Sequence, residues 1–321
     1  MRFGLFGTGP WAHQAHAPAL AAHPDVEFVG VWGRDPAKAA ALAGEHGAQP
    51  YAEIDALIAD VDAIAVALPP DVQADIALRA ARAGKHLLLD KPIAFTTEAA
   101  AEIVAAAAEQ QVAGVVFFTR RFMPQIQRFI DDVREAGGWL EARIDHLGSI
   151  FQPGNPFGAS VWRKESGGLW DVGPHAVALI LPVLGPVTKV TALAGDRDMT
   201  HVLLRHAGGA VSTLTLSVDA PEALEREDAA FYGESGVADV PPVPWLPVEA
   251  FCRAVDDLIT AAKGGPASAL DLTFGAEVGA ILAAAGESIS TGRTITLAEA
   301  EAEAGTEAGT GTETKAEAEA S

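Results

Sequence analysis

The first 120 residues alternate short apolar runs with Ala-rich stretches, and this alternation restricts the fold more than any other feature. Five of the runs are typical of strands, and the four stretches between them are typical of helices with short connections. Such alternation predicts βαβ units, which build a parallel sheet with helices on its faces. The expected strands are Arg2–Phe6, Val26–Trp32, Ala63–Leu68, His86–Leu89 and Val112–Thr119, and the expected helices are Ala12–His23, Pro36–Gly47, Val72–Gly84 and Glu98–Gln110.

A glycine-rich turn directly follows the first of these strands. Residues 7–12 fit the pattern G-x-G-x-x-G/A, in which the second glycine lets the backbone approach a diphosphate at a helix start. With so many glycines in the chain the pattern arises about once by chance, so its position between a strand and a helix is what makes it informative. The turn predicts a Rossmann dinucleotide-binding domain, with a plain strand-to-helix turn as the alternative. The predicted cofactor contacts are Gly7, Thr8, Gly9, Pro10, Trp11 and Ala12.

The end of the second strand bears on the choice between NAD and NADP. An NAD-binding domain usually places Asp or Glu about 20 residues after the glycines, where the acid binds the ribose 2′-hydroxyl. This chain has Gly33 at that position, followed by Arg34, whose guanidinium suits a 2′-phosphate. The sequence therefore favours NADP, with NAD as the alternative. In that alternative Arg34 is solvated, and Asp35 caps the next helix or takes the role of the acid.

The pattern changes after Arg120. Strand-like alternations appear at Glu141–Ser149, Val187–Leu193, Val202–His206 and Val211–Val218, with helices before and after them. They predict an α+β domain with a large, mostly antiparallel open sheet. We expect a dinucleotide-binding domain over residues 1–120 and a substrate-binding and oligomerisation domain over residues 121–298. Residues 299–321 are rich in Glu and have no large apolar side chain, so we expect a disordered acidic tail there.

Composition excludes several classes of function. The formal net charge is −21, which repels nucleic acid and anionic lipid surfaces. The longest apolar run, Ala176–Val187, is too short to cross a bilayer, and no secretory signal is predicted. The single cysteine, Cys252, excludes an internal disulfide and a thiolate metal cluster. We therefore expect a cytoplasmic protein that binds no nucleic acid, membrane or metal.

Three motifs taken together resemble a known family. They are the glycine loop, Asp90-Lys91-Pro92 at the end of a strand, and a D-x-G-x-H pattern from Asp171 to His175. The combination resembles the Gfo/Idh/MocA family, the relatives of glucose-fructose oxidoreductase and inositol dehydrogenase, from residue 2 to about 297. Asp90 departs from the family's usual Glu, a change that shortens the reach of the carboxylate.

The resemblance implies which residues form the site. Lys91, Asp171 and His175 match the family's catalytic positions, and a histidine is the natural proton donor and acceptor near neutral pH. If the chain is helical from Asp171, that residue and His175 lie on one face. The implied cofactor contacts are Leu68, Pro69, Asp90 and Lys91. The substrate candidates are Arg121, Asn155, Trp162 and Arg163, each of which could equally be a core or surface residue.

The implied activity is an NAD(P)-dependent dehydrogenase or reductase, with NADP favoured, that acts on CH–OH groups of a polyol, sugar or sugar-derived ketone. Two alternatives stay open: a non-catalytic nucleotide-binding regulatory protein of the same fold, and an enzyme with a tightly held, internally recycled cofactor. We expect a homo-oligomer, dimer or tetramer, because an open sheet is a common dimer surface in the resembled family.

Two further features of the sequence do not belong to these motifs. Gln73 is a second departure from the resembled family, in which a His is common at this position. The Pro-rich residues 240–247 are interpreted as a stiff loop.

Overall fold

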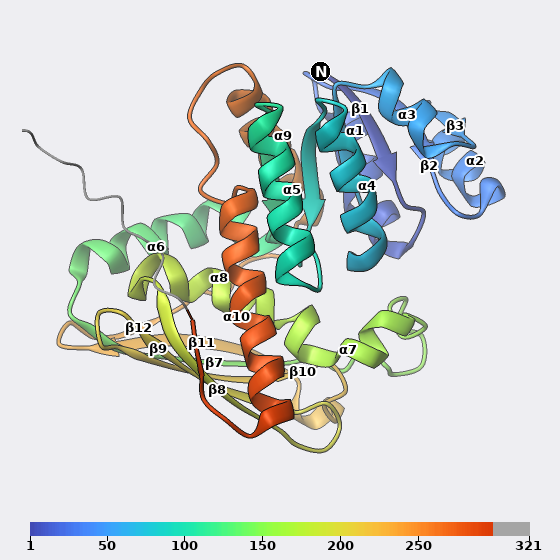
Figure 1. Cartoon of the computed structure of the whole chain (residues 1–321). Coiled ribbons are helices and arrows are strands. Elements are labelled where there is room, and N and C mark those ends of the chain that lie inside the picture. The colour runs from blue at the N-terminus through green and yellow to red at the C-terminus, as the bar shows by residue number, and fades with distance from the viewer. Residues whose placement is uncertain (298–321) are drawn as a thin grey trace, which may run out of the picture.

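The computed structural model describes residues 1–297 and contains two sheets, each with helices packed against it (Figure 1). The predicted acidic tail over residues 299–321 lies outside the described residues. The predicted architecture, a parallel sheet followed by a mostly antiparallel one, is confirmed. The domain boundary near residue 120 stays a prediction.

The first sheet has six parallel strands in the order β3-β2-β1-β4-β5-β6. In this doubly wound order the chain moves outward from β1 in one direction and then in the other, so a crevice opens at the carboxyl ends of β1 and β4. The strands are β1 (Arg2–Phe6), β2 (Glu27–Trp32), β3 (Gln49–Tyr51), β4 (Ala63–Val66), β5 (His86–Asp90) and β6 (Gly114–Phe117). The accompanying helices are α2 (Pro36–Glu45), α3 (Ile54–Asp60), α4 (Pro70–Arg82) and α5 (Thr97–Glu109).

Strand β3 of this sheet and the helix that follows it, α3, were not expected from the sequence. Strand β3 has only three residues, includes Pro50 and lies at the sheet edge, where proline is tolerated. The interior strand β4, by contrast, is buried at every position and therefore stands out as a continuous apolar run.

The stretch after the glycine loop also differs from the single α-helix expected over Ala12–His23. It begins as a π-helix, η1 (Ala12–His16), and continues as α1 (Ala17–Ala22). Pro18 has no N–H to donate to the carbonyl of Gln14, so regular α-helical hydrogen bonding cannot run unbroken through this segment.

The imidazole of His16, at the end of η1, is fully buried and lies 4.2 Å from the Phe251 ring, measured between centroids. Burial lowers its pKa to about 3. The unfolded chain takes up this proton near pH 6.5 and the native chain does not, so the free energy of unfolding falls as the pH drops from 6.5 toward 3. Between pH 7 and pH 5 the free energy of unfolding of the natural protein should fall by about 2 kcal/mol more than that of a His16→Leu variant. Urea titrations of both proteins at both pH values measure this, and parallel pH dependences would contradict it.

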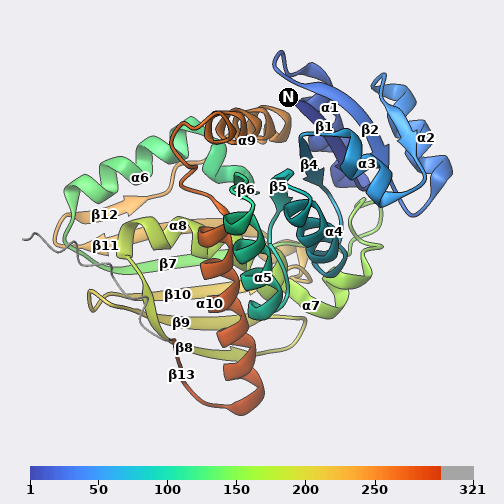
Figure 2. The same cartoon turned by 45° about the horizontal axis from the view of Figure 1, so that its top comes forward.

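The second sheet has seven strands in the order β12-β11-β7-β10-β9-β8-β13. Only the β7–β10 pair is parallel among the strand pairs of this sheet in the described residues. Helices α8 and α10 cover one face (Figure 2), and β9 alternates buried and exposed residues along its length, as a strand with one covered face should. The strands are β7 (Trp139–Leu147), β8 (Val187–Ala194), β9 (Thr200–His206), β10 (Val211–Ser217), β11 (Arg226–Gly233), β12 (Gly236–Asp239) and β13 (Ile295–Thr296). The remaining helical elements are η2 (Thr119–Phe122), α6 (Pro124–Ala136), α7 (Val161–Asp171), α8 (Gly173–Leu184), η3 (Glu222–Leu224), α9 (Pro247–Ala262) and α10 (Leu272–Thr291).

Two helices from the last part of the chain pack against the first sheet or its helices, and one of them also reaches the second sheet. Helix α10 packs against both α5 and β8, and Figure 1 shows it running from one sheet to the other. Helix α9 packs against β5 and β6, so the chain returns to the first sheet after building most of the second.

Two helical stretches are apolar and long enough to cross a membrane by length and composition alone. They are Val161–Leu184 and Leu272–Thr291, and 72% and 50% of their most apolar windows are buried inside the structure. Such burial is typical of the core helices of a folded domain.

Candidate active site

The glycine loop has the geometry that a dinucleotide requires. Gly7 has a φ of +127°, and a Cβ at this position would lie 2.3 Å from the carbonyl oxygen of Ala67, so only glycine fits. Nothing lies within 4 Å of the place a Cβ of Gly9 would take, which leaves this backbone open to approach. The loop leads into η1 at the carboxyl end of β1, beside β4, where the fold provides its crevice. These features fit the diphosphate of a dinucleotide.

The residues after β2 also bear on the cofactor. A Cβ at Gly33 would lie 2.6 Å from Cγ2 of Thr8, so an acidic side chain does not fit there unless Thr8 moves. The Asp35 carboxylate accepts hydrogen bonds from the backbone N–H groups of Ala37 and Lys38 and caps α2, which was one of the roles left open for it. Arg34 is exposed between these two positions.

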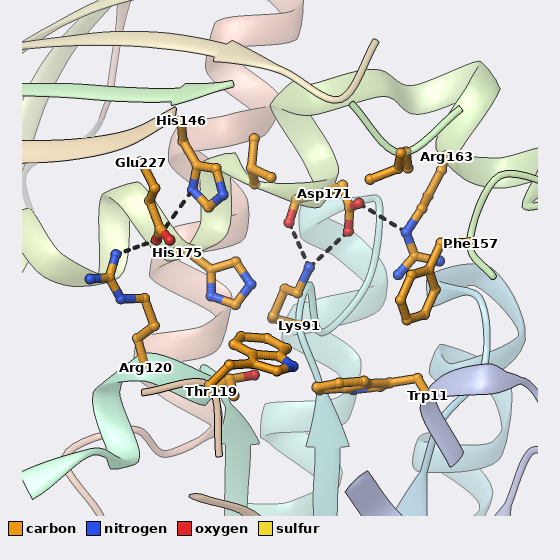
Figure 3. A pocket seen from close by; sticks show the side chains of 13 residues that line it. Trp11, Lys91, Thr119, Arg120, His146, Phe157, Arg163, Asp171, His175 and Glu227 are labelled. Atoms are coloured by element: carbon orange, nitrogen blue, oxygen red, sulfur yellow. Dashed lines mark hydrogen bonds and ion pairs between the residues drawn. The ribbon is translucent and has the colours of Figure 1, made fainter. Parts of the chain in front are cut away.

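A buried ion-paired cluster joins the end of β5 to α7 (Figure 3). Lys91 Nζ donates to the Asp171 carboxylate oxygen Oδ1 at 2.9 Å and to its backbone carbonyl at 2.5 Å, and Arg163 Nε donates to Oδ2 at 2.9 Å. Burial opposes ionisation of Asp171, but the charges and hydrogen bonds of Lys91 and Arg163 outweigh it and hold the pKa of the carboxyl below its usual value. Asp171 is therefore ionised and fixes the Lys91 ammonium in place.

Asp171 and His175 come together because α7 and α8 are nearly continuous. Only Val172 separates the two helices, and it keeps right-handed helical dihedrals. The Ala176 N–H donates to the Val172 carbonyl, so the helical turn expected between Asp171 and His175 forms. Both side chains line the same cavity as Lys91.

A second imidazole lies beside His175 in this cavity. The rings of His146 and His175 have centroids 6.2 Å apart, and His146 Nδ1 lies 3.7 Å from Glu227 Oε1. Glu227 is also paired with Arg120. Burial, followed by the positive charge of Lys91, holds the pKa of His175 well below its ordinary value, and burial also lowers the pKa of His146. Both imidazoles are therefore neutral near pH 7.

The cavity has a volume of about 190 Å³ and two unlike sides. The ion-paired and imidazole groups form a polar side, and the rings of Trp11, Phe157 and Trp245 form an aromatic side. Because Trp11 belongs to the glycine loop, the cavity borders the predicted cofactor site.

Comparison with known proteins gives the family. A profile described as "Oxidoreductase family, NAD-binding Rossmann fold" matches residues 1–118, and one described as "GFO/IDH/MocA C-terminal domain" matches residues 136–239. D-xylose 1-dehydrogenase (NADP(+)) 2 of Haloferax volcanii is 30% identical over 235 residues, which are 69% of this chain and 71% of that relative. The chain belongs to the GFO/IDH/MocA oxidoreductase family.

Two further comparisons agree with this assignment. The dTDP-3,4-didehydro-2,6-dideoxy-alpha-D-glucose 3-reductase of Streptomyces antibioticus is 29% identical over 248 residues, 74% of each chain. The solved structure of a myo-inositol dehydrogenase from Corynebacterium glutamicum ATCC 13032 superposes with a TM-score of 0.80 over 92% of this chain and 98% of that one. At 22% identity this last match shows the fold alone. The family and the oxidoreductase class inferred from the three motifs are confirmed.

The structure brings only some of the predicted substrate residues of this GFO/IDH/MocA protein to the cavity. Arg163 lines it, whereas Arg121, Asn155 and Trp162 do not. Arg121 is buried and donates to the Ala178 carbonyl, Asn155 accepts a hydrogen bond from a backbone N–H of its own loop, and Trp162 packs against Phe95.

Eight of the cavity residues were not among the candidates from the sequence, and the polar or large aromatic ones among them include Arg120, His146, Phe157, Glu227 and Trp245. Arg120 is next to the candidate Arg121, and the 3₁₀ turn η2 points the two side chains in different directions. The period-2 pattern of the predicted strand 141–149 could have identified His146, since Ala142 and Ile144, which share its face of the strand, are buried.

Gln73, the departure from the family's common His, clamps the loop that carries Lys91. Its Nε2 donates to the backbone carbonyls of Asp90, Pro92 and Ile93, and its Oε1 accepts from the Asp90 N–H at 2.8 Å. The Asp90 carboxylate in turn accepts from the Lys91 N–H, and burial raises the pKa of Asp90 to about 6. Gln73 therefore ties α4 to the loop that carries Lys91 through four hydrogen bonds.

Replacing Gln73 by Leu should lower the free energy of unfolding by about 1–3 kcal/mol, because it leaves buried backbone groups of the loop without partners. A Gln125→Leu variant is the matched control, since Gln125 is exposed on α6 and its replacement should cost little. Denaturant titration of the three proteins measures the difference. Equal stability of the two variants would contradict the clamp.

Proposed function

We propose that the protein transfers a hydride between a nicotinamide cofactor, NADP(H) in preference to NAD(H), and a CH–OH or carbonyl carbon of a polyol, sugar or sugar-derived ketone. The convergence of Lys91, Asp171 and His175 on one cavity beside the glycine loop carries this proposal. The names of the Haloferax and Streptomyces relatives support the substrate class, and the Haloferax name supports NADP.

In this proposal the carboxyl edge of the first sheet holds the cofactor. The glycine loop, residues 7–12, binds the diphosphate. Gly33 has no side chain to exclude the 2′-phosphate, and Arg34 donates hydrogen bonds to it. Leu68 and Pro69 follow β4, and Asp90 and Lys91 close β5, so the two pairs lie at the same sheet edge. When bound, the nicotinamide supplies the site that accepts or donates the hydride.

His175 is the proposed proton acceptor for alcohol oxidation. Its neutral imidazole takes the hydroxyl proton, while the Lys91 ammonium stabilises negative charge on the same oxygen. Asp171 stays ionised and orients Lys91. Because the pKa of His175 is lowered, the base stays unprotonated down to pH values below 6.5, and the oxidation rate should fall only when the pH passes through that lowered pKa.

The test is a panel of polyols, sugars and sugar ketones with NADP(H) and NAD(H), followed at the nicotinamide absorbance band. Turnover of at least one member with preference for NADP(H) supports the proposal. Nucleotide binding without any turnover would favour a regulatory protein, and purified protein that carries reduced-cofactor fluorescence would favour an internally recycled cofactor.

The exposed face of the second sheet supports a homo-oligomer, dimer or tetramer. Leu193 and Leu203 are 68% and 50% exposed on its strands. Burying these side chains against a second copy would remove apolar surface from water. Sedimentation velocity tests this, and a monomer at micromolar concentration would contradict it.

A further inference from the structure

The Pro-rich segment 240–247, here called the proline strap, lies at the mouth of the cavity. It connects β12 to α9 and carries Trp245, whose ring centroid lies 5.9 Å from that of Trp11 with 31° between the planes. Trp245 lines the cavity and is nevertheless 65% exposed. So large an exposed aromatic surface at a cavity mouth is a surface on which a ligand can stack.

The proline strap is stiff, and both of its ends are anchored. Four of its eight residues are proline, which fixes φ at each of those positions. The Val240 N–H donates to the Ala229 carbonyl on β11, and the Ala250 N–H donates to the Leu246 carbonyl at the start of α9. Trp245 is therefore held in place before a ligand arrives, and binding costs little ordering entropy.

The two sides of the cavity suit a ring that is apolar on one face and polar at its rim. Trp245, Trp11 and Phe157 form the aromatic side. Lys91, His175 and Trp11 line the same space, and Figure 3 shows the Lys91 ammonium turned toward Asp171. The axial C–H groups of a pyranose or cyclitol can lie on indole rings, while its hydroxyls reach the ammonium and imidazole groups.

The charges and the volume argue for a small substrate without a diphosphate. In the described part of the chain the three cations that line the cavity are paired with two carboxylates: Lys91 and Arg163 share Asp171, and Arg120 pairs with Glu227. The single positive charge left over is too little to balance a diphosphate. The volume of about 190 Å³ is also below the roughly 300 Å³ at which pockets for larger ligands begin.

We infer that Trp245 is a specificity-determining residue, whose indole stacks on the C–H face of a single-ring pyranose or cyclitol that carries no nucleotide diphosphate. The inference rests on the proposed function and deepens it, because it selects rings over open-chain polyols and over nucleotide-linked sugars. The stacked ring presents a rim hydroxyl to Lys91 and His175.

The experiment compares Trp245→Ala and Trp245→Phe with the natural protein, and Leu246→Ala is the control for disturbance of the proline strap. Leu246 is 38% exposed and is not among the cavity residues. Substrates are myo-inositol and D-xylose as rings, xylitol and sorbitol as open chains, and UDP-glucose as a nucleotide-linked sugar. Trp245→Ala should lower kcat/KM for the ring substrates roughly tenfold, mainly through KM, whereas Trp245→Phe should stay within about threefold. Leu246→Ala should leave kcat/KM for the ring substrates unchanged. None of the three variants should change the dissociation constant for NADP(H).

Calorimetric binding of the ring compounds to the cofactor-loaded protein gives a readout that does not need turnover. Loss of ring binding in Trp245→Ala supports the inference even if the panel shows no hydride transfer, a result that would sink the proposed function alone. The inference itself is overturned if Trp245→Ala binds and turns over rings as the natural protein does. It is also overturned if the natural protein prefers open-chain or nucleotide-linked substrates.

Discussion

Replacement of His175 by Ala, or of Lys91 by Met, is expected to lower turnover by at least about two orders of magnitude and to change the NADP(H) dissociation constant only a few-fold. His175 is neutral and faces the cavity, and Lys91 is fixed there by Asp171. In the proposed mechanism both groups act on the reacting oxygen. Neither belongs to the loop that is proposed to hold the diphosphate. Lys91 is one of the proposed cofactor contacts, but the diphosphate is held elsewhere, so both effects should appear mainly in turnover.

The double variant should lose less than the product of the two single effects, because both groups act on one oxygen. A His201→Ala variant is the matched control, since His201 is exposed on β9. Turnover assays beside cofactor titrations on the four variants and the natural protein give the answer. Near-normal turnover in His175→Ala would move the proton step to Lys91, and normal turnover in both single variants would remove the catalytic role of this cavity.

Arg34→Ala is expected to weaken NADP(H) binding roughly tenfold to hundredfold and to leave NAD(H) binding unchanged. The reason is local: Thr8 occupies the space that an acid at position 33 would need, Asp35 is engaged as a helix cap, and Arg34 is exposed between them. Fluorescence titration with both reduced cofactors measures the two affinities.

Arg82→Ala, at an exposed arginine near the end of α4, controls for a general change in protein charge. Equal weakening of both cofactors in Arg34→Ala, or a natural preference for NAD, would refute the assignment of the 2′-phosphate to this turn.

Much of the first sheet could be predicted because its interior strands are buried on both faces. Strand β4 is apolar at every position, and the glycine loop follows β1 without a gap. Strand β3 could not be predicted, because three residues at a sheet edge with a proline among them have no periodic signal. Strand β11 was missed for a similar reason, since its first three residues are all exposed and do not alternate.

The cavity was predictable only where short motifs mark it. Lys91, Asp171 and His175 lie in motifs whose spacing in the sequence is fixed. Glu227 and Trp245 reach the same cavity from an unexpected strand and from a loop, and their positions depend on tertiary packing. Arg120 and Arg121 differ only by the direction in which one turn of 3₁₀ helix points them, which residue type does not reveal.

The last strand of the first sheet can be covered only after α9 and the start of α10 have been synthesised. Phe251 on α9 covers Phe117 of β6, and the Val116 N–H at the sheet edge donates to the Leu270 carbonyl, just before α10. A ribosome that has released only residues 1–120 has therefore made all six strands but not the groups that cover the last of them. Until the chain has grown past α10, this nascent unit exposes an apolar surface and an open strand edge, both of which promote aggregation.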